Sequence, residues 1–261
     1  MSAPTAQLIT IRDCKVNCLR KGVGAPLLFL HGARGGGAWA PFMEKLSEHY
    51  DVIAPEHPGF GASDDPRWLD SISDVAYFYL DFMAALDLRG VHVVGNSLGG
   101  WLALEIAVRS IERLASLCLL APAGLFLPGK PPADVFLWSA ETLAKNLFVN
   151  PDLVAATLAM KPTPEQQRAQ LKNLATVAKL GWNPRFHNPD LRKWLHRVTI
   201  PTLVMWGRED RINPVDYAAT FEELIPNSRT SIIPECGHLP HIEKLPVFIE
   251  QMTGFTREIA Q

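Results

Sequence analysis

Ser97 is the residue whose sequence surroundings point most directly to chemistry. It lies in the run GNSLGG at residues 95–100, after the strand-like run VHVV and before an apolar helical pattern that begins at Trp101. A Gly-x-Ser-x-Gly at a strand-to-helix turn exposes the serine hydroxyl, and the helix N-terminus offers free N–H groups to an oxyanion. A chance Gly/Ser turn has the same five-residue pattern, but the flanking strand and helix favour a nucleophile.

Two residues farther along the chain match the acid and the base that such a serine needs. Asp210 follows the strand-like run PTLVMW at 201–206, and His238 follows the short run SIIP at 231–234. The order serine, acid, histidine is the one expected for this type of turn. Both side chains come just after a strand, at the edge where open α/β sheets collect their functional residues. We therefore predict that Ser97, Asp210 and His238 form a catalytic triad.

Neighbouring residues are alternatives for these roles. Glu209 precedes Asp210, and His241 follows His238 by three residues but falls at the start of a helix. Cys236 is an alternative nucleophile, although no strand-to-helix turn surrounds it. Their positions disfavour all three, and the choice stays open until their surroundings are known.

Several motifs and their order resemble the α/β-hydrolase fold family along nearly the whole chain. Besides the serine turn, the similar stretches are LLFLHGA at 27–33, PEHPGFGAS at 55–63, WGRED at 206–210, and Gly237-His238 with Glu243 and Pro246. Glu56 stands where the family usually has Asp. The resemblance implies a mainly parallel α/β-hydrolase sheet with helices on both faces and an inserted helical cap.

The resemblance also implies a mechanism. His238 takes the proton of Ser97 as the serine attacks a carbonyl carbon, and Asp210 holds the imidazole. The backbone N–H groups of Ala33 and Leu98 form the oxyanion hole, and water releases the acyl group from the serine. This chemistry requires no metal and no cofactor.

The first expectation for the reaction is hydrolysis of a carboxylic ester of small to medium, partly apolar substrates through an acyl-enzyme. A serine nucleophile argues against haloalkane dehalogenases and soluble epoxide hydrolases, which carry Asp at this turn. Asn96 makes the turn similar to hydrolases that cleave carbon–carbon bonds in ring-fission products of aromatic degradation, although Leu239 stands where they have Trp after the histidine. A non-catalytic ligand-binding protein on the same fold is a further alternative.

Residues that contact the substrate are harder to infer. The tentative choices lie beside the predicted triad or among the large apolar residues of the cap: Arg34, Asn96, Trp138, Trp182 and Leu239. Arg34 and Arg185 are the two cations considered for a substrate carboxylate, since a guanidinium fits that group. Apolar residues in the cap predict an enclosed pocket that prefers small or medium groups over long-chain lipid.

Strand-like and helical segments alternate along the chain, which predicts a parallel sheet covered on both faces. One segment departs from this alternation, because residues 122–195 contain no convincing strand. Three helical stretches occur there instead, at about 133–148, 151–161 and 164–180. We expect residues 1–121 and 196–261 to form the α/β-hydrolase core and residues 122–195 to form a cap above it.

Composition agrees with one well-cored domain of 261 residues, 48% hydrophobic and 20% charged. The formal net charge of −2 gives no reason to expect nucleic acid or an anionic membrane as a partner. No apolar run approaches the length of a membrane span, and the first residues lack the features of a signal peptide. We expect a cytoplasmic monomer or homodimer that acts on a small-molecule substrate and keeps its four cysteines as thiols.

Overall fold

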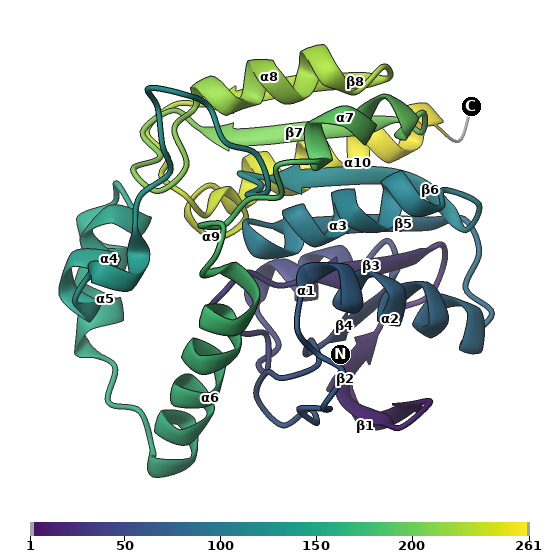
Figure 1. Cartoon of the computed structure of the whole chain (residues 1–261), viewed down its shortest axis with the longest axis horizontal. Helices are drawn as coiled ribbons and strands as arrows, with labels where there is room; N and C mark the ends of the chain where they lie inside the picture. Colours follow the sequence, from purple (N-terminus) through teal and green to yellow (C-terminus); the bar gives the residue numbers. More distant parts are fainter. Residues whose placement is uncertain (1–2, 260–261) are drawn as a thin grey trace.

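The computed structural model describes residues 3–259, which fold around one eight-stranded sheet (Figure 1). The strands are β1 (Thr5–Ile11), β2 (Cys14–Lys21), β3 (Pro26–Leu30), β4 (Asp51–Pro55), β5 (Val91–Asn96), β6 (Leu114–Leu120), β7 (Thr202–Gly207) and β8 (Ser228–Ile233). Their order across the sheet is β1-β2-β4-β3-β5-β6-β7-β8. Strand β2 is antiparallel to both of its neighbours, and the other adjacent pairs are parallel.

Helices cover both faces of this sheet. One apolar core is shared by α2 (Ile72–Ala85), α3 (Leu98–Arg109) and α8 (Asp216–Leu224), and the other by α1 (Pro41–Leu46) and α10 (Leu245–Ile259). Side chains alternate between the faces of a strand, so Val93 and Val94 of β5 belong to different cores. Strands β5 and β7 are buried along their whole length, as expected for parallel strands covered on both sides. The predicted fold class is confirmed.

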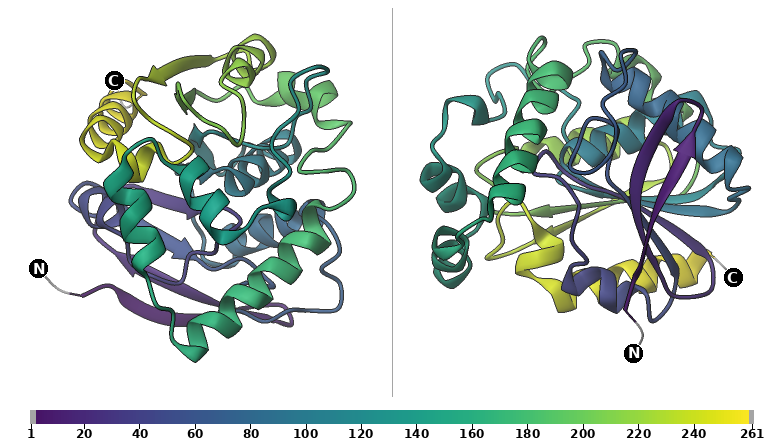
Figure 2. Two further views of the ribbon diagram at one scale, coloured as in Figure 1. Left: turned by 90° about the vertical axis from the view of Figure 1, so that its left-hand side faces the viewer. Right: turned by 90° about the horizontal axis from the view of Figure 1, so that it is seen from below.

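The chain between β6 and β7 forms further helices, most of which lie beside the sheet, whereas the last two pack on the face that carries α3. They are the 3₁₀ turn Val135–Leu137, α4 (Ala140–Leu147), α5 (Pro151–Ala159), α6 (Pro164–Gly181), α7 (Leu191–Trp194) and the 3₁₀ turn Leu195–Arg197. Figures 1 and 2 show that α4, α5 and α6 lie to one side of the sheet and of the helices that cover its faces. Below, "cap" denotes residues 122–195, whose limits stay a prediction.

The helix expected over 133–148 is wrong as a single element. The 3₁₀ turn ends at Leu137, Trp138 is extended, and α4 begins only at Ala140. Ser139 causes this break, because its side chain accepts a hydrogen bond from Thr142 N and so caps a new helix. Helix α7 and the 3₁₀ turn after it were not expected either.

The cap helices bury only part of their apolar side chains, since Leu158 of α5 and Leu171 and Leu174 of α6 are exposed. Helix α6 has 18 residues, and its buried positions lie on one face between Asn173 and Gly181. Between residues 3 and 259, no helix has both the length and the apolar character needed to cross a membrane.

Candidate active site

Ser97 occupies a strained turn between β5 and α3. Its backbone is in the left-handed region, with φ +53° and ψ −112°, which few residues other than glycine adopt. Ser97 N donates to Leu120 O at 2.9 Å, and Ser97 O accepts from Ala123 N at 3.0 Å. Both flanking residues, Asn96 and Leu98, are buried, whereas Ser97 itself stays partly exposed. This is the geometry that the sequence around Ser97 predicts for a nucleophile.

The glycines of this turn permit close packing of α3 on the sheet. A Cβ on Gly95 would collide with Gly99 O, and a Cβ on Gly99 would collide with Leu30 O at the end of β3. The first turn of α3 therefore lies against β3 and β5, with the serine at the helix N-terminus. Free N–H groups at such a terminus favour negative charge near Ser97.

His238 and Asp210 lie in direct contact. His238 Nδ1 is 2.8 Å from Asp210 Oδ2, and both side chains are buried. The other oxygen, Asp210 Oδ1, accepts hydrogen bonds from Ile212 N at 2.8 Å and Asn213 N at 3.0 Å, so the carboxylate is held in place. A histidine that donates through Nδ1 keeps Nε2 free to accept a proton.

The structure joins the predicted acid and base directly but not the serine to the base. Within residues 3–259, Ser97 Oγ makes no hydrogen bond to another residue, whereas His238 and Asp210 are bonded to each other. Hydrogen bonds of this kind are often long without substrate and shorten when substrate is bound. The catalytic roles of Ser97, His238 and Asp210 therefore stay predictions.

Glu209, the alternative acid, has a different position. Its Oε2 accepts from Cys236 N at 3.0 Å, and Glu209 N donates to Cys236 O at 3.0 Å. These two hydrogen bonds hold together the turns after β7 and β8. Cys236 is buried, and burial raises the pKa of its thiol to about 12, so the reactive thiolate is disfavoured.

His241, the alternative base, lies in the apolar core. Its ring packs against Phe29, Phe42 and Phe248, with centroid distances of 4.8 to 6.1 Å. Burial lowers the pKa of His241 to about 3, and Nδ1 is buried without a hydrogen-bond partner among the described residues. The surroundings of His241 are those of a neutral core residue.

The loop after β3 approaches the serine turn. A Cβ on Gly32 would lie 2.9 Å from Asn96 Oδ1 and 3.6 Å from Ser97 Cβ, so residue 32 is a close neighbour of the serine. Gly35 N donates to Gly32 O at 3.1 Å and closes a turn that contains Ala33. Neither Ala33 N nor Leu98 N donates a hydrogen bond within the described part of the chain. Both amides are therefore free for the predicted oxyanion role.

Residues 25–245 match the model of a known family, described as alpha/beta hydrolase fold. The chain belongs to the α/β-hydrolase fold family. It is 30% identical to 2-hydroxy-6-oxo-6-(2'-aminophenyl)hexa-2,4-dienoic acid hydrolase of Metapseudomonas resinovorans, over 97% of this chain and 91% of that protein. It is 29% identical to 2-hydroxy-6-oxononadienedioate/2-hydroxy-6-oxononatrienedioate hydrolase of Cupriavidus pinatubonensis, over 97% and 96%.

A solved structure of a related hydrolase is also similar to this chain over nearly its whole length. A serine hydrolase involved in carbazole degradation, the CarC enzyme, superposes on this α/β hydrolase with a TM-score of 0.76 at 26% identity. The match covers 98% of this chain and 99% of that chain. The similarity therefore includes the cap as well as the core.

His31 supports the loop after β3 in this α/β hydrolase. Its Nδ1 donates to Gly32 O at 2.8 Å, and its Nε2 accepts from His57 N at 3.0 Å. The His31 ring stacks on His57, with the centroids 3.7 Å apart. Burial lowers the pKa of His31 to about 4, so the ring is neutral and one nitrogen can accept. These contacts give His31 a structural role in supporting the loop.

Helix α4 of the cap contacts the turn that carries His238. His238 N donates to Leu147 O at 2.9 Å, at the C-terminal end of α4. Trp138 and Leu239 pack against the same apolar cluster, which contains Leu147, Phe148 and Ile212. These two tentative substrate residues are thus neighbours beside the predicted base, and their contact with substrate stays a prediction.

The other tentative substrate residues differ in what they contact. Arg185 lies 3.3 Å from Asp134 in an ion pair and stacks 3.6 Å over the Trp182 ring. Asn96 is buried, and its Nδ2 donates to Leu120 O at 3.1 Å. Arg34 forms no ion pair with any described carboxylate. Of the two cations considered for a substrate, Arg185 is already paired and Arg34 is not.

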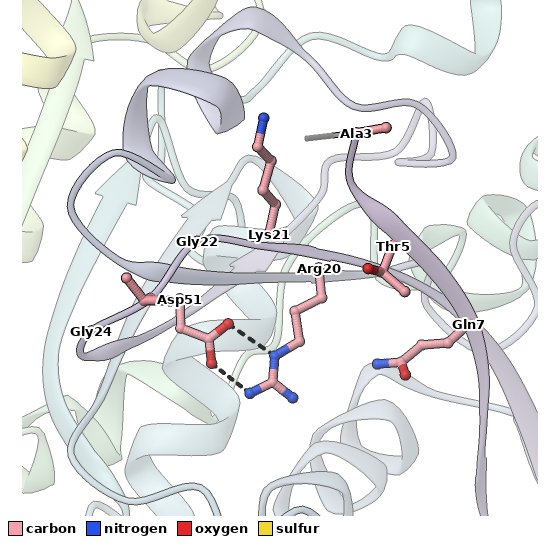
Figure 3. Close-up of a pocket in the computed structure, with 9 residues that line it drawn as sticks. Ala3, Thr5, Gln7, Arg20, Lys21, Gly22, Gly24 and Asp51 are labelled. Atoms are coloured by element: carbon pink, nitrogen blue, oxygen red, sulfur yellow. Dashed lines mark hydrogen bonds and ion pairs between the residues drawn. The ribbon is translucent and has the colours of Figure 1, made fainter. Parts of the chain in front are cut away.

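A separate hollow lies at the edge of the sheet (Figure 3). It has a volume of about 620 Å³ and is lined by Ala3, by residues of β1, β2 and the chain after β2, and by Asp51 of β4. Its Arg20 is paired with Asp51, with Nε 2.9 Å from Oδ1. None of the predicted site residues lines it, so this hollow is distinct from the candidate active site.

The sequence alone did not indicate a functional role for two residues that contact the loops of the candidate site. Asn173 of α6 is buried, and its Nδ2 donates to Arg34 O at 3.0 Å. Glu243 bonds to Gly237 N and to the start of α5. A polar Asn173 on the same helix face as Val177 and Leu180 is the signal that could have drawn attention to the first.

Proposed function

We propose that this α/β hydrolase cleaves a carbon–carbon bond in ring-fission products of aromatic degradation, of the 2-hydroxy-6-oxodienoate class. The observation that supports this substrate class is the end-to-end similarity to dienoate hydrolases, at 30% and 29% identity for the two relatives above. The sequence motifs alone favoured ester hydrolysis, and the similarity favours the carbon–carbon alternative instead.

The chemistry uses the residues of the serine turn and the His238–Asp210 pair. Ser97 attacks the ketone carbon, His238 Nε2 accepts the serine proton, and the N–H groups of Ala33 and Leu98 stabilise the oxyanion. The 2-hydroxyl proton of the substrate first moves to C5, which converts the dienol to the conjugated ketone. Breaking the C5–C6 bond then leaves the acyl group on the serine and the electron pair on a dienolate, which receives a proton. Water then releases the acyl group, so the overall reaction adds hydroxyl to one carbon and a proton to the other.

Arg34 is the cation that we assign to the substrate carboxylate. It lies on the same loop as Ala33 and has no described carboxylate partner, whereas Arg185 is paired with Asp134. Loss of surrounding water lowers the pKa of Arg34, although the side chain keeps exposed surface. A bound carboxylate would compensate for this loss, because a guanidinium matches it with two parallel hydrogen bonds.

Ester hydrolysis is the second candidate. Leu239 follows His238 where the carbon–carbon hydrolases carry Trp, and it packs with Trp138 into an apolar cluster. Such surroundings suit a small or medium apolar group, for example the acyl or aryl part of an ester.

The test compares both substrates on one purified protein. We expect loss of the dienolate absorbance of 2-hydroxy-6-oxo-6-phenylhexa-2,4-dienoate at a kcat/KM well above that for p-nitrophenyl acetate and butyrate. Ser97→Ala should abolish both activities without changing the melting temperature by more than a few degrees. Faster turnover of the esters would favour the second candidate. Turnover that survives Ser97→Ala would refute the proposed mechanism.

A further inference from the structure

Helix α6 of the cap is bonded to two loops of the core. Thr176 Oγ1 donates to Gly59 O at 2.6 Å, and Lys172 Nζ donates to Gly61 O at 3.1 Å. Asn173, between them, reaches a different loop as well. These contacts attach one face of α6 to the backbone below it.

Asn173 uses both ends of its amide. Its Oδ1 accepts from Gly61 N at 2.8 Å, and its Nδ2 donates to Arg34 O at 3.0 Å. Arg34 lies 139 residues away along the chain, in the turn that contains Ala33. The Asn173 side chain therefore connects the cap to the loop of the predicted oxyanion hole.

The peptide group between Arg34 and Gly35 is held at both of its polar atoms. Its carbonyl accepts from Asn173, and its N–H donates to Gly32 O at 3.1 Å. Gly35 has φ +95°, and a Cβ there would lie 2.5 Å from Asn173 Nδ2. Because the turn 32–35 is short, fixing this peptide group restricts the orientation of the preceding one, whose N–H belongs to Arg34, and of the Ala33 amide next to it.

We propose that Asn173 is a positioning residue that sets the direction of the Ala33 N–H and couples it to the cap. The inference rests on the proposed function, because it requires that Ala33 stabilises an oxyanion. A donor placed in advance lowers the barrier more than one that must reorient during the reaction. The position of α6 therefore controls transition-state stabilisation.

The alternative is that Asn173 only stabilises the cap. Replacing Asn173 leaves buried backbone groups without hydrogen-bond partners, which costs free energy. The replacement therefore lowers the stability of the fold under either explanation. Lys172 and Thr176 provide matched controls, since they attach the same helix to the 57–63 loop without touching Arg34. A purely structural role predicts similar effects at all three positions.

The experiment measures five variants against the wild type: Asn173→Ala, Asn173→Asp, Gly35→Ala, Lys172→Met and Thr176→Val. Asn173→Asp keeps an acceptor for Gly61 N but loses the donor to Arg34 O. The measurements are kcat and KM with p-nitrophenyl acetate, the inhibition constant of a trifluoromethyl ketone that forms a tetrahedral adduct, and the melting temperature. Labelling by a fluorophosphonate reports whether Ser97 reacts at all.

We expect both Asn173 variants to lower kcat by about 10- to 100-fold with KM nearly unchanged. The inhibition constant of the ketone should rise by a similar factor. Lys172→Met and Thr176→Val should lower kcat by less than about threefold even where they lower the melting temperature as much. Gly35→Ala should reproduce the Asn173 effect from the other side of the contact.

Equal effects of the Asn173, Lys172 and Thr176 variants on kcat, or Asn173 variants that change KM alone, would overturn the inference. A wild-type chain whose Ser97 is not labelled and that hydrolyses no substrate would overturn the proposed function itself. A reactive wild type with unaltered Asn173 variants would overturn the positioning role alone.

Discussion

Glu243 Oε2 accepts a hydrogen bond of 2.6 Å from Gly237 N, one residue before His238. The other oxygen of this carboxylate accepts from Val149 N at 2.7 Å and Asn150 N at 2.6 Å, where the cap enters α5. One side chain thus joins the turn of the predicted base to the cap. Because Asn173 bonds to Arg34 O, the cap is connected both to the turn of His238 and to the loop of Ala33.

Replacing Glu243 should therefore affect stability and activity together. We expect Glu243→Ala to lower the free energy of unfolding by about 2 to 3 kcal/mol, because three backbone N–H groups lose a charged acceptor. It should also lower kcat, since the turn that holds His238 loosens. Chemical denaturation and steady-state kinetics measure both effects. Glu235→Gln, an exposed change on the same turn, is the control, and an equal loss there would contradict this explanation.

Asp210→Asn should lower kcat by about 10³- to 10⁴-fold, because the amide no longer stabilises the charged imidazole or fixes its tautomer. Glu209→Gln should leave kcat within about threefold, since Glu209 bonds to Cys236 N rather than to the histidine. Steady-state measurement of kcat for both variants tests which residue is the acid, and the melting temperature of each variant controls for loss of folding. A larger loss for Glu209→Gln would reverse the assignment of the acid.

Stability should fall in mild acid because several histidines are buried in the neutral form. Burial lowers the pKa of His241 to about 3 and that of His31 to about 4. Above pH 6.5 neither the folded nor the unfolded state binds a proton at these groups. As the pH falls below 6.5, only the unfolded state takes up protons, so stability decreases until the pH reaches the folded pKa.

His241→Leu isolates one of these groups. Between pH 6 and 4.5 it should reduce the pH dependence of the unfolding free energy by about 1.4 kcal/mol per pH unit, the value for one proton. At pH 7.5 it should be tolerated, because the ring lies among phenylalanines and Nδ1 has no described partner. Urea denaturation across this pH range provides the measurement, with exposed His196→Gln as the control. An unchanged slope in His241→Leu would show that this histidine is not buried neutral.

Arg34→Met should distinguish the two substrate classes. We expect it to lower kcat/KM for the dienoate by about 10- to 100-fold through loss of a charge-assisted hydrogen bond, and to leave p-nitrophenyl acetate within about threefold. Arg185→Met is the matched control, because its guanidinium is paired with Asp134 and stacked on Trp182. A greater loss of kcat/KM for the dienoate in Arg185→Met would indicate that Arg185 of the cap binds the substrate carboxylate.

Most of the fold could be predicted because its signals are local. The apolar strand-like runs, the glycines around Ser97 and the order of Ser97, Asp210 and His238 can all be read within a few residues of each position. The prediction of one continuous helix over 133–148 was wrong for a related reason. It followed the local apolar pattern and did not take into account that Ser139 can cap a new helix. Contacts between residues that are far apart in the chain have no such local signal in the sequence.

The sequence by itself determined the α/β class, the strained serine turn and the types of side chain available for chemistry, because these depend on neighbouring residues. Only the tertiary structure decided that Asp210 rather than Glu209 contacts His238, that His241 lies in the core, and that Asn173 reaches Arg34. The last contact joins residues 139 positions apart. Contacts of this kind depend on how whole helices and loops pack, and the pattern within any one segment does not specify that packing.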